Sequence, residues 1–240
     1  MNQENQNKYY IDHKAKIIKK FSITKKYAEK VLLDYFSKSE VKTMLNDITI
    51  MFEQLLPHIP YIGGKKNGLT FNLLASAWAL AFFRTLEKKE LSTREMGKYL
   101  YEINDEYANS KSNLTKWVLT KLLGTKLIGR LLKRRAEKSQ LKRYPDDWVM
   151  EFVDSEGQNF DIGFNYTECG ICKFYKQMNA EQYLPYLCLM DYPNAQSLGI
   201  GLKRTQTIGN GDPMCDFRFI KNQSPISGWP PEDLPEFKGS

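Results

Sequence analysis

The stretch "GNGDPMCDFRF" (Gly209–Phe219) predicts how the C-terminal part of the chain folds. Its second half alternates apolar and polar residues, which is the period of a β-strand with one buried face. The preceding "GNGDP" favours a turn, because Gly and Asn tolerate positive φ and Pro blocks helix propagation. A tight turn should therefore carry one thiol, Cys215, into a strand. That thiol could be structural, a metal ligand or part of an active site.

The same alternation predicts the other strands of an antiparallel sheet. A hairpin is expected from strands near residues 148–154 and 160–166, and further strands near 202–207 and 214–220. Before residue 144 the apolar residues recur at helical spacing. Helices are predicted over residues 25–39, 40–56 and 69–86, and another starts at a capping box formed by Ser92 and Glu95.

A helical half followed by a strand-rich half is the order of an α+β protein rather than of repeated βαβ units. We expect a helical N-terminal half packed on a small antiparallel sheet with C-terminal helices. Residues 1–240 should form a single domain. Its parts would be a mainly helical subdomain (1–143), a sheet-containing subdomain with the cysteine motifs (144–220) and a Pro-rich tail (221–240), either an extended strap or disordered.

Positive charge is concentrated in one segment. The net charge is +7, and Lys111–Arg143 contains 11 basic residues and one acid, Glu137. Apolar residues in it, at Leu114, Trp117, Val118, Leu122, Leu127, Ile128 and Leu131, form one helical stripe. The favoured interpretation is a solvated amphipathic helix that covers the core. Contact with a membrane surface or nucleic acid is the less favoured alternative.

Several classes of protein are disfavoured by what the chain lacks. The first 20 residues are polar, and the longest apolar run, Leu73–Phe83, has 11 residues, too few to span a bilayer. A soluble, cytoplasmic protein is expected. The familiar Walker, dinucleotide-binding and zinc-protease motifs do not occur.

The four cysteines all lie in the C-terminal third, with the spacing C-x2-C-x15-C-x26-C from Cys169 to Cys215. A zinc ribbon would present a second C-x2-C pair, so structural zinc is a minority alternative, as is redox chemistry at "CGIC". From their local sequence, Cys172 and Cys188 are expected to be small, buried apolar residues.

The chain has two histidines, and one of them, His58, lies in a Pro/Gly loop where a functional group would be well placed. On a helix, Asp191 would share a face with Cys188.

Several blocks occur together in the order of a known family. They are "IPYIGGKKN" (59–67), "RYPDDWVMEFV" (143–153), "FDIGFNYTECGICKFYK" (160–176), "LPYLCLMDY" (184–192) and "LKRTQTIGNGDPMCDFRF" (202–219). Over roughly residues 55–219 the chain resembles the L-2-amino-thiazoline-4-carboxylic acid hydrolase family. The closing block is also similar to 4-vinyl-reductase-type small-molecule-binding domains, which implies an α+β fold with a pocket between helices and sheet. The positions that match the family pattern are Asn67, Tyr166, Glu168, Cys169, Cys188, Asp191, Arg204 and Cys215.

The resemblance implies a hydrolase that opens a small amidine or thiazoline-type C–N or C–S bond. Arg204 suits the substrate carboxylate, and Glu168 or Asp191 suits the amidinium group. The nucleophile would be the Cys169 or Cys215 thiolate, or water activated by Glu168 or Asp191. Tyr166, Asn67, His58 and Cys188 are candidate substrate-binding residues. No cofactor is implied, a small-molecule substrate is the expected partner, and homo-oligomerisation stays open. The alternative is a non-catalytic small-molecule-binding or sensor protein.

Overall fold

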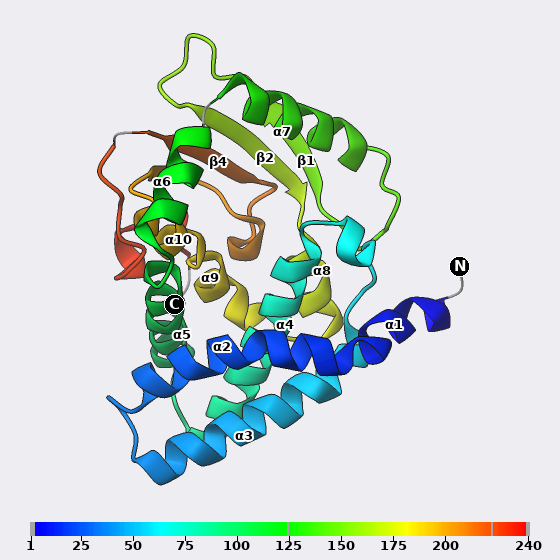
Figure 1. The fold of residues 1–240 in the computed structure, drawn as a ribbon, viewed down its shortest axis with the longest axis vertical. Coiled ribbons are helices and arrows are strands. Elements are labelled where there is room, and N and C mark those ends of the chain that lie inside the picture. Colours follow the sequence, from blue (N-terminus) through cyan, green and yellow to red (C-terminus); the bar gives the residue numbers. More distant parts are fainter. Residues whose placement is uncertain (1–2, 124, 222, 239–240) are drawn as a thin grey trace.

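The computed structural model describes residues 3–123, 125–221 and 223–238, and it has the expected α+β architecture. Figure 1 shows helices in the first half of the chain and an antiparallel sheet, with short helices, in the second half. The sheet has four strands. The sheet lies beside the long helices rather than within an alternating βα arrangement. The fold class predicted from the order of the periodic segments is therefore confirmed.

The N-terminal half is built around one almost fully buried helix. The helices are α1 (Gln3–Asp12), α2 (Lys14–Leu32), α3 (Lys38–Leu55), α4 (Thr70–Leu86) and α5 (Thr93–Asn109). Apolar residues occupy most of α4, which packs against α3. Helix α5 begins at the predicted capping box, in which Ser92 and Glu95 each accept a backbone N–H of the other. Short 3-10 turns follow the helices at Leu56–His58, Gly64–Lys66 and Glu87–Lys89.

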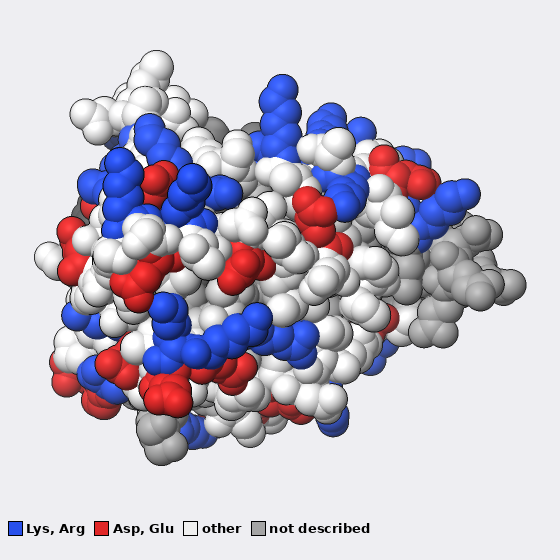
Figure 2. All heavy atoms as spheres, turned by 90° about the horizontal axis from the view of Figure 1, so that it is seen from below, with Lys and Arg blue, Asp and Glu red and all other residues white. Residues whose placement is uncertain are grey.

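The outer face formed by α2 and α3 carries both signs of charge. Seen from below, this face shows acidic and basic side chains beside one another (Figure 2). Several of them are paired, including Lys30 with Glu106 and Lys89 with Glu40. This balance contrasts with the basic segment described below.

The sheet has the order β1-β2-β4-β3, with β1 (Val149–Val153), β2 (Ile162–Glu168), β3 (Gly201–Lys203) and β4 (Cys215–Ile220). Helices α8 (Gly170–Gln177), α9 (Leu184–Cys188) and α10 (Asp191–Ser197) connect β2 to β3, and 3-10 turns lie at Glu181–Tyr183, Ile208–Asn210 and Pro231–Asp233. All four predicted strands are present, but β3 ends at Lys203. The next amides, of Thr205 and Gln206, donate to the Asp216 carboxylate instead of extending the ladder.

The basic segment differs from its prediction. It forms two helices, α6 (Asn113–Leu122) and α7 (Lys126–Ser139), rather than one. The expectation that its apolar stripe covers the core is wrong for most of the stripe, because Leu114, Trp117 and Leu127 are 71%, 60% and 59% exposed. The opposite face of α7 packs on β1, where Ala136 is buried. The periodicity of the apolar residues predicts an amphipathic helix, but it does not indicate which face of that helix packs against the rest of the protein.

The Pro-rich tail is an ordered strap over residues 223–238 rather than a disordered end. Leu234 and Glu236 are buried, and the Glu236 carboxylate accepts hydrogen bonds from Tyr192 and Arg204. The tail therefore contributes a buried charge to the second half of the chain.

Over the described residues, none of the helices combines the length and the apolar character that crossing a membrane requires.

Candidate functional site

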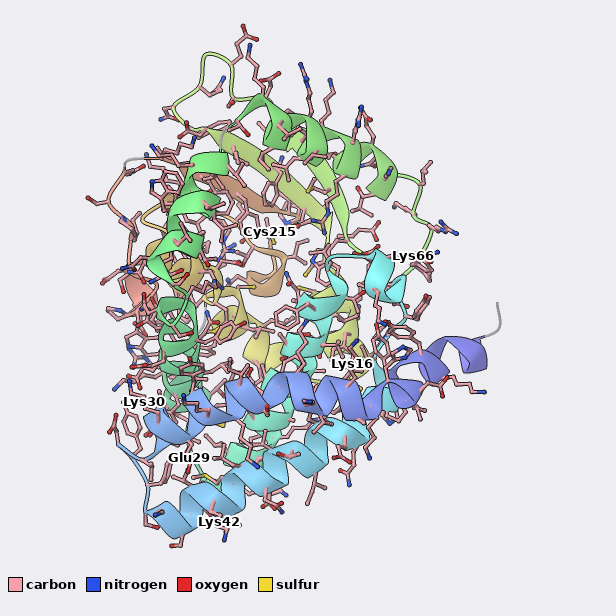
Figure 3. The ribbon with its side chains drawn as sticks, in the orientation of Figure 1. Lys16, Glu29, Lys30, Lys42, Lys66 and Cys215 are labelled. Atoms are coloured by element: carbon pink, nitrogen blue, oxygen red, sulfur yellow. The ribbon has the colours of Figure 1, made fainter. Side chains whose placement is uncertain are left out.

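All four cysteines line one cavity of about 590 Å³ between the helical half and the sheet. Its helical wall is mostly apolar and includes Phe71 and Trp78 from α4 and Ile103 from α5. In Figure 3, Cys215 lies in the interior at the start of β4, whereas Lys30 and Lys42 lie on the outer helices. We call this space the thiol cavity. The remaining polar residues that the sequence singled out in its wall are Tyr166, Asp191 and Arg204.

Cys169 stands where β2 ends and α8 begins. It is the N-cap residue of α8, and the groups that act on its thiol are the Cys172 thiol, the backbone N–H groups of Cys172 and Ile171, and Trp148. These groups, with Cys172 foremost, lower the pKa of the Cys169 thiol against the opposing effect of burial. The residue after Cys169 is a glycine, Gly170, and a Cβ at this position would lie 2.7 Å from the Trp148 ring. The first turn of α8 therefore packs in close contact with the Trp148 indole.

The other three thiols are held in the neutral form. Donation to Cys169, with burial second, raises the pKa of Cys172, and burial raises the pKa of Cys188. Burial also raises the pKa of Cys215 to about 12, although the Ile208 N–H donates to its Sγ at 3.2 Å. Cys188 is further confined by Gly209, where a Cβ would lie 2.6 Å from the Cys188 Sγ. Of the four thiols, that of Cys169 alone has a lowered pKa.

The Arg204 guanidinium is already occupied by protein groups. Its Nη1 donates to Asp191 Oδ2 at 2.7 Å, its Nη2 donates to the Cys188 carbonyl at 2.9 Å, and both Nε and Nη2 donate to Glu236. Asp191 remains half-exposed at the cavity wall. The arrangement orients Asp191 toward the cavity and leaves Arg204 little capacity to bind a second carboxylate.

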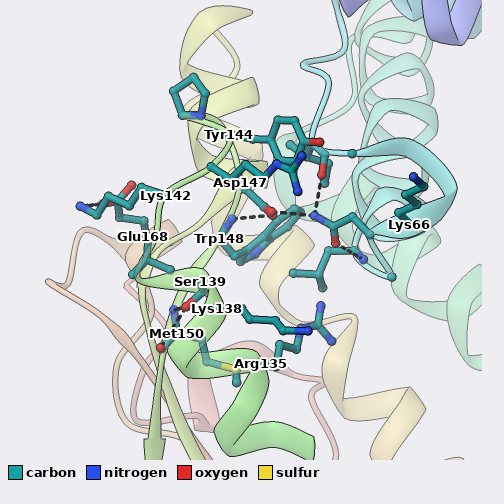
Figure 4. A pocket seen from close by; sticks show the side chains of 18 of the residues that line it. Lys66, Arg135, Lys138, Ser139, Lys142, Tyr144, Asp147, Trp148, Met150 and Glu168 are labelled. Carbon is teal, nitrogen blue, oxygen red and sulfur yellow. Dashed lines mark hydrogen bonds and ion pairs between the residues drawn. The ribbon is translucent and has the colours of Figure 1, made fainter.

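Glu168 and Asn67 line a second, more open cleft of about 1070 Å³, shown in Figure 4. Glu168 pairs with Lys142 at 2.5 Å and with Lys173, and these lysines lower its pKa. Asn67 donates to Asp147 at 2.6 Å and accepts from the Leu69 N–H, so it fixes the entry to α4. We call this space the basic cleft, after the residues Lys65, Lys66, Arg134, Arg135, Lys138, Lys142 and Arg143 in its wall.

The basic cleft and the thiol cavity share a wall formed by Leu69, Trp148 and Tyr166. Burial raises the pKa of Tyr166 to about 12, and Arg135 opposes this shift, so the guanidinium acts at the boundary between the two spaces. The phenol is therefore a hydrogen-bond donor near neutral pH. His58, in the 3-10 turn Leu56–His58, is exposed and lies in the wall of neither space.

Three residues of this site were not singled out from the sequence: Trp148, Arg135 and Glu236. Trp148 lay within a recognised block, but its contact with the start of α8 depends on tertiary packing. Arg135 was one of many basic residues, and Glu236 lay in a tail expected to be extended or disordered. A lone glutamate flanked by Pro and Phe, "LPEF", was the one available signal for a buried acid. Within the described ranges, no group of three or more His, Cys, Asp or Glu side chains could hold a metal ion.

A family model described as L-2-amino-thiazoline-4-carboxylic acid hydrolase matches residues 72–219, more than half of the chain. The chain belongs to this family. The matched range includes most of α4, strands β1 to β3, most of β4 and every cysteine of the thiol cavity, so the resemblance to this family is confirmed. No curated protein and no solved structure gave a significant match.

Proposed function

We propose that this family member hydrolyses a small cyclic amidine acid of the 2-amino-thiazoline-4-carboxylate type in the thiol cavity, with the Cys169 thiolate as nucleophile. The observation that carries the proposal is the contrast between the thiols. The Cys172 thiol, foremost, together with nearby backbone N–H groups and Trp148 lowers the pKa of Cys169, whereas the pKa of Cys172, Cys188 and Cys215 is raised. A thiolate, not a thiol, attacks carbon, so the chemistry selects Cys169 from the two sequence candidates.

The proposed reaction consumes one water and no other co-reactant. The Cys169 Sγ forms a bond to the amidine carbon C2, the ring C2–S bond breaks, and the departing sulfur takes up a proton. The resulting S-amidinyl-enzyme, an isothiourea, is then attacked by water at the same carbon. The Cys169 thiolate leaves, and the product is a urea that carries a free thiol. The soft thiolate suits the first step because an amidine carbon is a weak electrophile.

In the proposed reaction, polar groups in the wall of the thiol cavity and at its boundary bind the substrate, orient the attacking water and donate a proton. Asp191 is half-exposed and held by Arg204, so it can accept hydrogen bonds from the amidine N–H groups and orient the attacking water. The Tyr166 phenol, in the wall of the cavity, would donate to a ring nitrogen or sulfur as charge develops there. With Arg204 engaged by Asp191 and Glu236, Arg135 at the boundary of the basic cleft is the better match for the substrate carboxylate.

In the competing mechanism Glu168 or Asp191 activates water directly, and Glu168 is poorly suited to that role. Lys142 and Lys173 lower its pKa, and a carboxylate with a lowered pKa is a weaker base. Its place in the wall of the basic cleft, and not of the thiol cavity, also separates it from the thiols.

The experiment is a turnover assay with 2-amino-thiazoline-4-carboxylate, in which a thiol reagent follows ring opening and an ammonia assay follows loss of the exocyclic nitrogen. Cys169→Ser should lower kcat on the order of a thousandfold while substrate still binds, as judged by calorimetry. The matched controls, Cys215→Ser and Glu168→Gln, should turn over at rates near wild type.

Two outcomes would reject the proposal. Full activity of Cys169→Ser would exclude the thiolate mechanism at this residue. Wild-type protein that binds the amidine acid but releases neither thiol nor ammonia would favour the alternative, a non-catalytic small-molecule-binding protein.

A further inference from the structure

Helices α6 and α7 present large apolar side chains to solvent. No residue of α6 is buried, and the exposed set on the two helices includes Leu114, Trp117, Leu119, Leu122, Leu127 and Leu131. A few isolated exposed leucines are normal on a protein surface, but several large exposed apolar side chains on each of two consecutive helices indicate an interaction surface. The protein holds α6 from one side, where the Thr120 hydroxyl donates to the Leu198 carbonyl at 2.8 Å.

The charge around these apolar side chains is almost entirely positive. Between Lys111 and Arg143 the chain has 11 basic residues and one acid. Exposed lysines at 121, 126 and 133 alternate with the apolar positions, and their long stems can lie along an apolar surface while the ammonium groups stay in water. The α2–α3 face shows that the segment is unusual, because there acidic and basic side chains are mixed (Figure 2).

We propose that the α6–α7 surface docks on an anionic lipid bilayer as a pair of interfacial amphipathic helices. Leucine and tryptophan would insert at the boundary between headgroups and acyl chains, where Trp is favoured, and the basic residues would meet anionic headgroups. The helices lie on the bilayer in this arrangement and do not cross it.

Two other occupants fit less well. A second copy of this chain would bring two strongly basic segments together in any symmetric contact, and like charges at an interface oppose association. Nucleic acid would satisfy the lysines and arginines through its phosphates but would leave the exposed leucines without an apolar partner. Of these three occupants, the lipid surface matches both the charge and the exposed apolar side chains. The proposal is independent of the reaction assigned to the thiol cavity.

The test is flotation with vesicles of phosphatidylcholine alone or with about one third phosphatidylserine. The full chain should bind the anionic vesicles and not the neutral ones. The double variant Leu114→Ser/Trp117→Ser should lower the apparent affinity on the order of tenfold or more, because these side chains supply buried apolar area. Lys121→Glu/Lys133→Glu should also weaken binding, by about fivefold for each charge removed. Raising NaCl from about 0.1 M to about 0.5 M should weaken wild-type binding.

The matched controls lie on the mixed-charge face of α3. Ile50 is about as exposed as the α6 residues, and Lys42 is also exposed, so Ile50→Ser and Lys42→Glu should bind as wild type does. Equal binding to neutral and anionic vesicles, or no vesicle binding, would overturn the proposal. So would binding of a DNA duplex in place of vesicles, or a dimer that the Leu114→Ser/Trp117→Ser change dissociates while no vesicles bind.

Discussion

The Arg204 Nη2 and the Glu236 Oε1 lie 3.1 Å apart, and both side chains are 1% exposed. The pair joins the C-terminal tail to the residues that follow β3, across 32 positions in the chain. Arg204 also lies over the Phe217 ring, at 4.8 Å from its centroid, so the guanidinium is enclosed by apolar as well as acidic groups. The tail is thereby part of the support of the thiol cavity, because Arg204 in turn holds Asp191.

The first prediction concerns this pair. Glu236→Gln should lower the free energy of unfolding by about 3 kcal/mol, since removing one partner leaves a buried charge with less compensation. Urea unfolding followed by circular dichroism measures the change. Glu232→Gln, in the exposed pair with Arg94, is the matched control and should leave the midpoint nearly unchanged. Equal effects of the two substitutions would show that the tail adds nothing specific.

The second prediction concerns thiol reactivity and pH. Because neighbouring groups, Cys172 foremost, lower the pKa of Cys169 and burial raises that of Cys215 to about 12, iodoacetamide at neutral pH should alkylate Cys169 first. The Cys169 rate should rise with pH and level off below the pH at which an ordinary thiol does, since the thiolate fraction saturates above the pKa. Peptide mass spectrometry reads out each site. In urea the four cysteines should react alike, and earlier labelling of Cys215 in the folded protein would contradict the assignment.

The third prediction uses the close approach of Gly209 to Cys188. Gly209→Ala would place a Cβ 2.6 Å from the Cys188 Sγ and should lower the free energy of unfolding by about 1–3 kcal/mol. Cys188→Ala removes the sulfur, so the double variant should recover part of that loss relative to Cys188→Ala alone. Gly129→Ala, where nothing lies within 4 Å, serves as the control in thermal unfolding. Additive losses in the double variant would rule out the contact as the cause.

The fourth prediction rests on the proposed substrate and the basic cleft. Arg135→Gln should raise KM roughly 10- to 100-fold, as expected for losing one hydrogen bond to a charged group, and should change kcat little. Steady-state kinetics with 2-amino-thiazoline-4-carboxylate separates the two constants. Arg130→Gln, on the same helix but outside the cleft wall, should keep the wild-type KM. An unchanged KM for Arg135→Gln would mean that another cation binds the carboxylate.

The sequence predicted those elements whose local pattern and tertiary role agree. The alternation from Cys215 to Phe219 became β4, and the Ser92–Glu95 capping box starts α5, because strand and cap signals depend on neighbouring residues alone. The hairpin of β1 and β2 followed for the same reason.

What could not be predicted depends on contacts between distant segments. The pattern of apolar residues on α6 and α7 does not indicate whether they will face the protein core or solvent. In the structure most of them face solvent. The difference in pKa between Cys169 and Cys215 arises from the start of α8, from Trp148 and from burial, none of which the residue types reveal. Nor did the composition of the tail indicate that Glu236 would be buried against Arg204.

The thiol cavity lies between the two halves of the chain, with Phe71 and Ile103 on the helical side and Tyr166 and Phe217 on the sheet side. The cavity is therefore enclosed only when the two halves pack against each other, because neither half encloses it alone. The two halves are joined through an exposed stretch that includes Leu141, which is 78% exposed and open to a protease. Limited cleavage there should give a nicked, non-covalent pair in which Cys215 resists alkylation. Separating the fragments should expose that thiol at once, so its labelling rate would measure how firmly the halves reassemble.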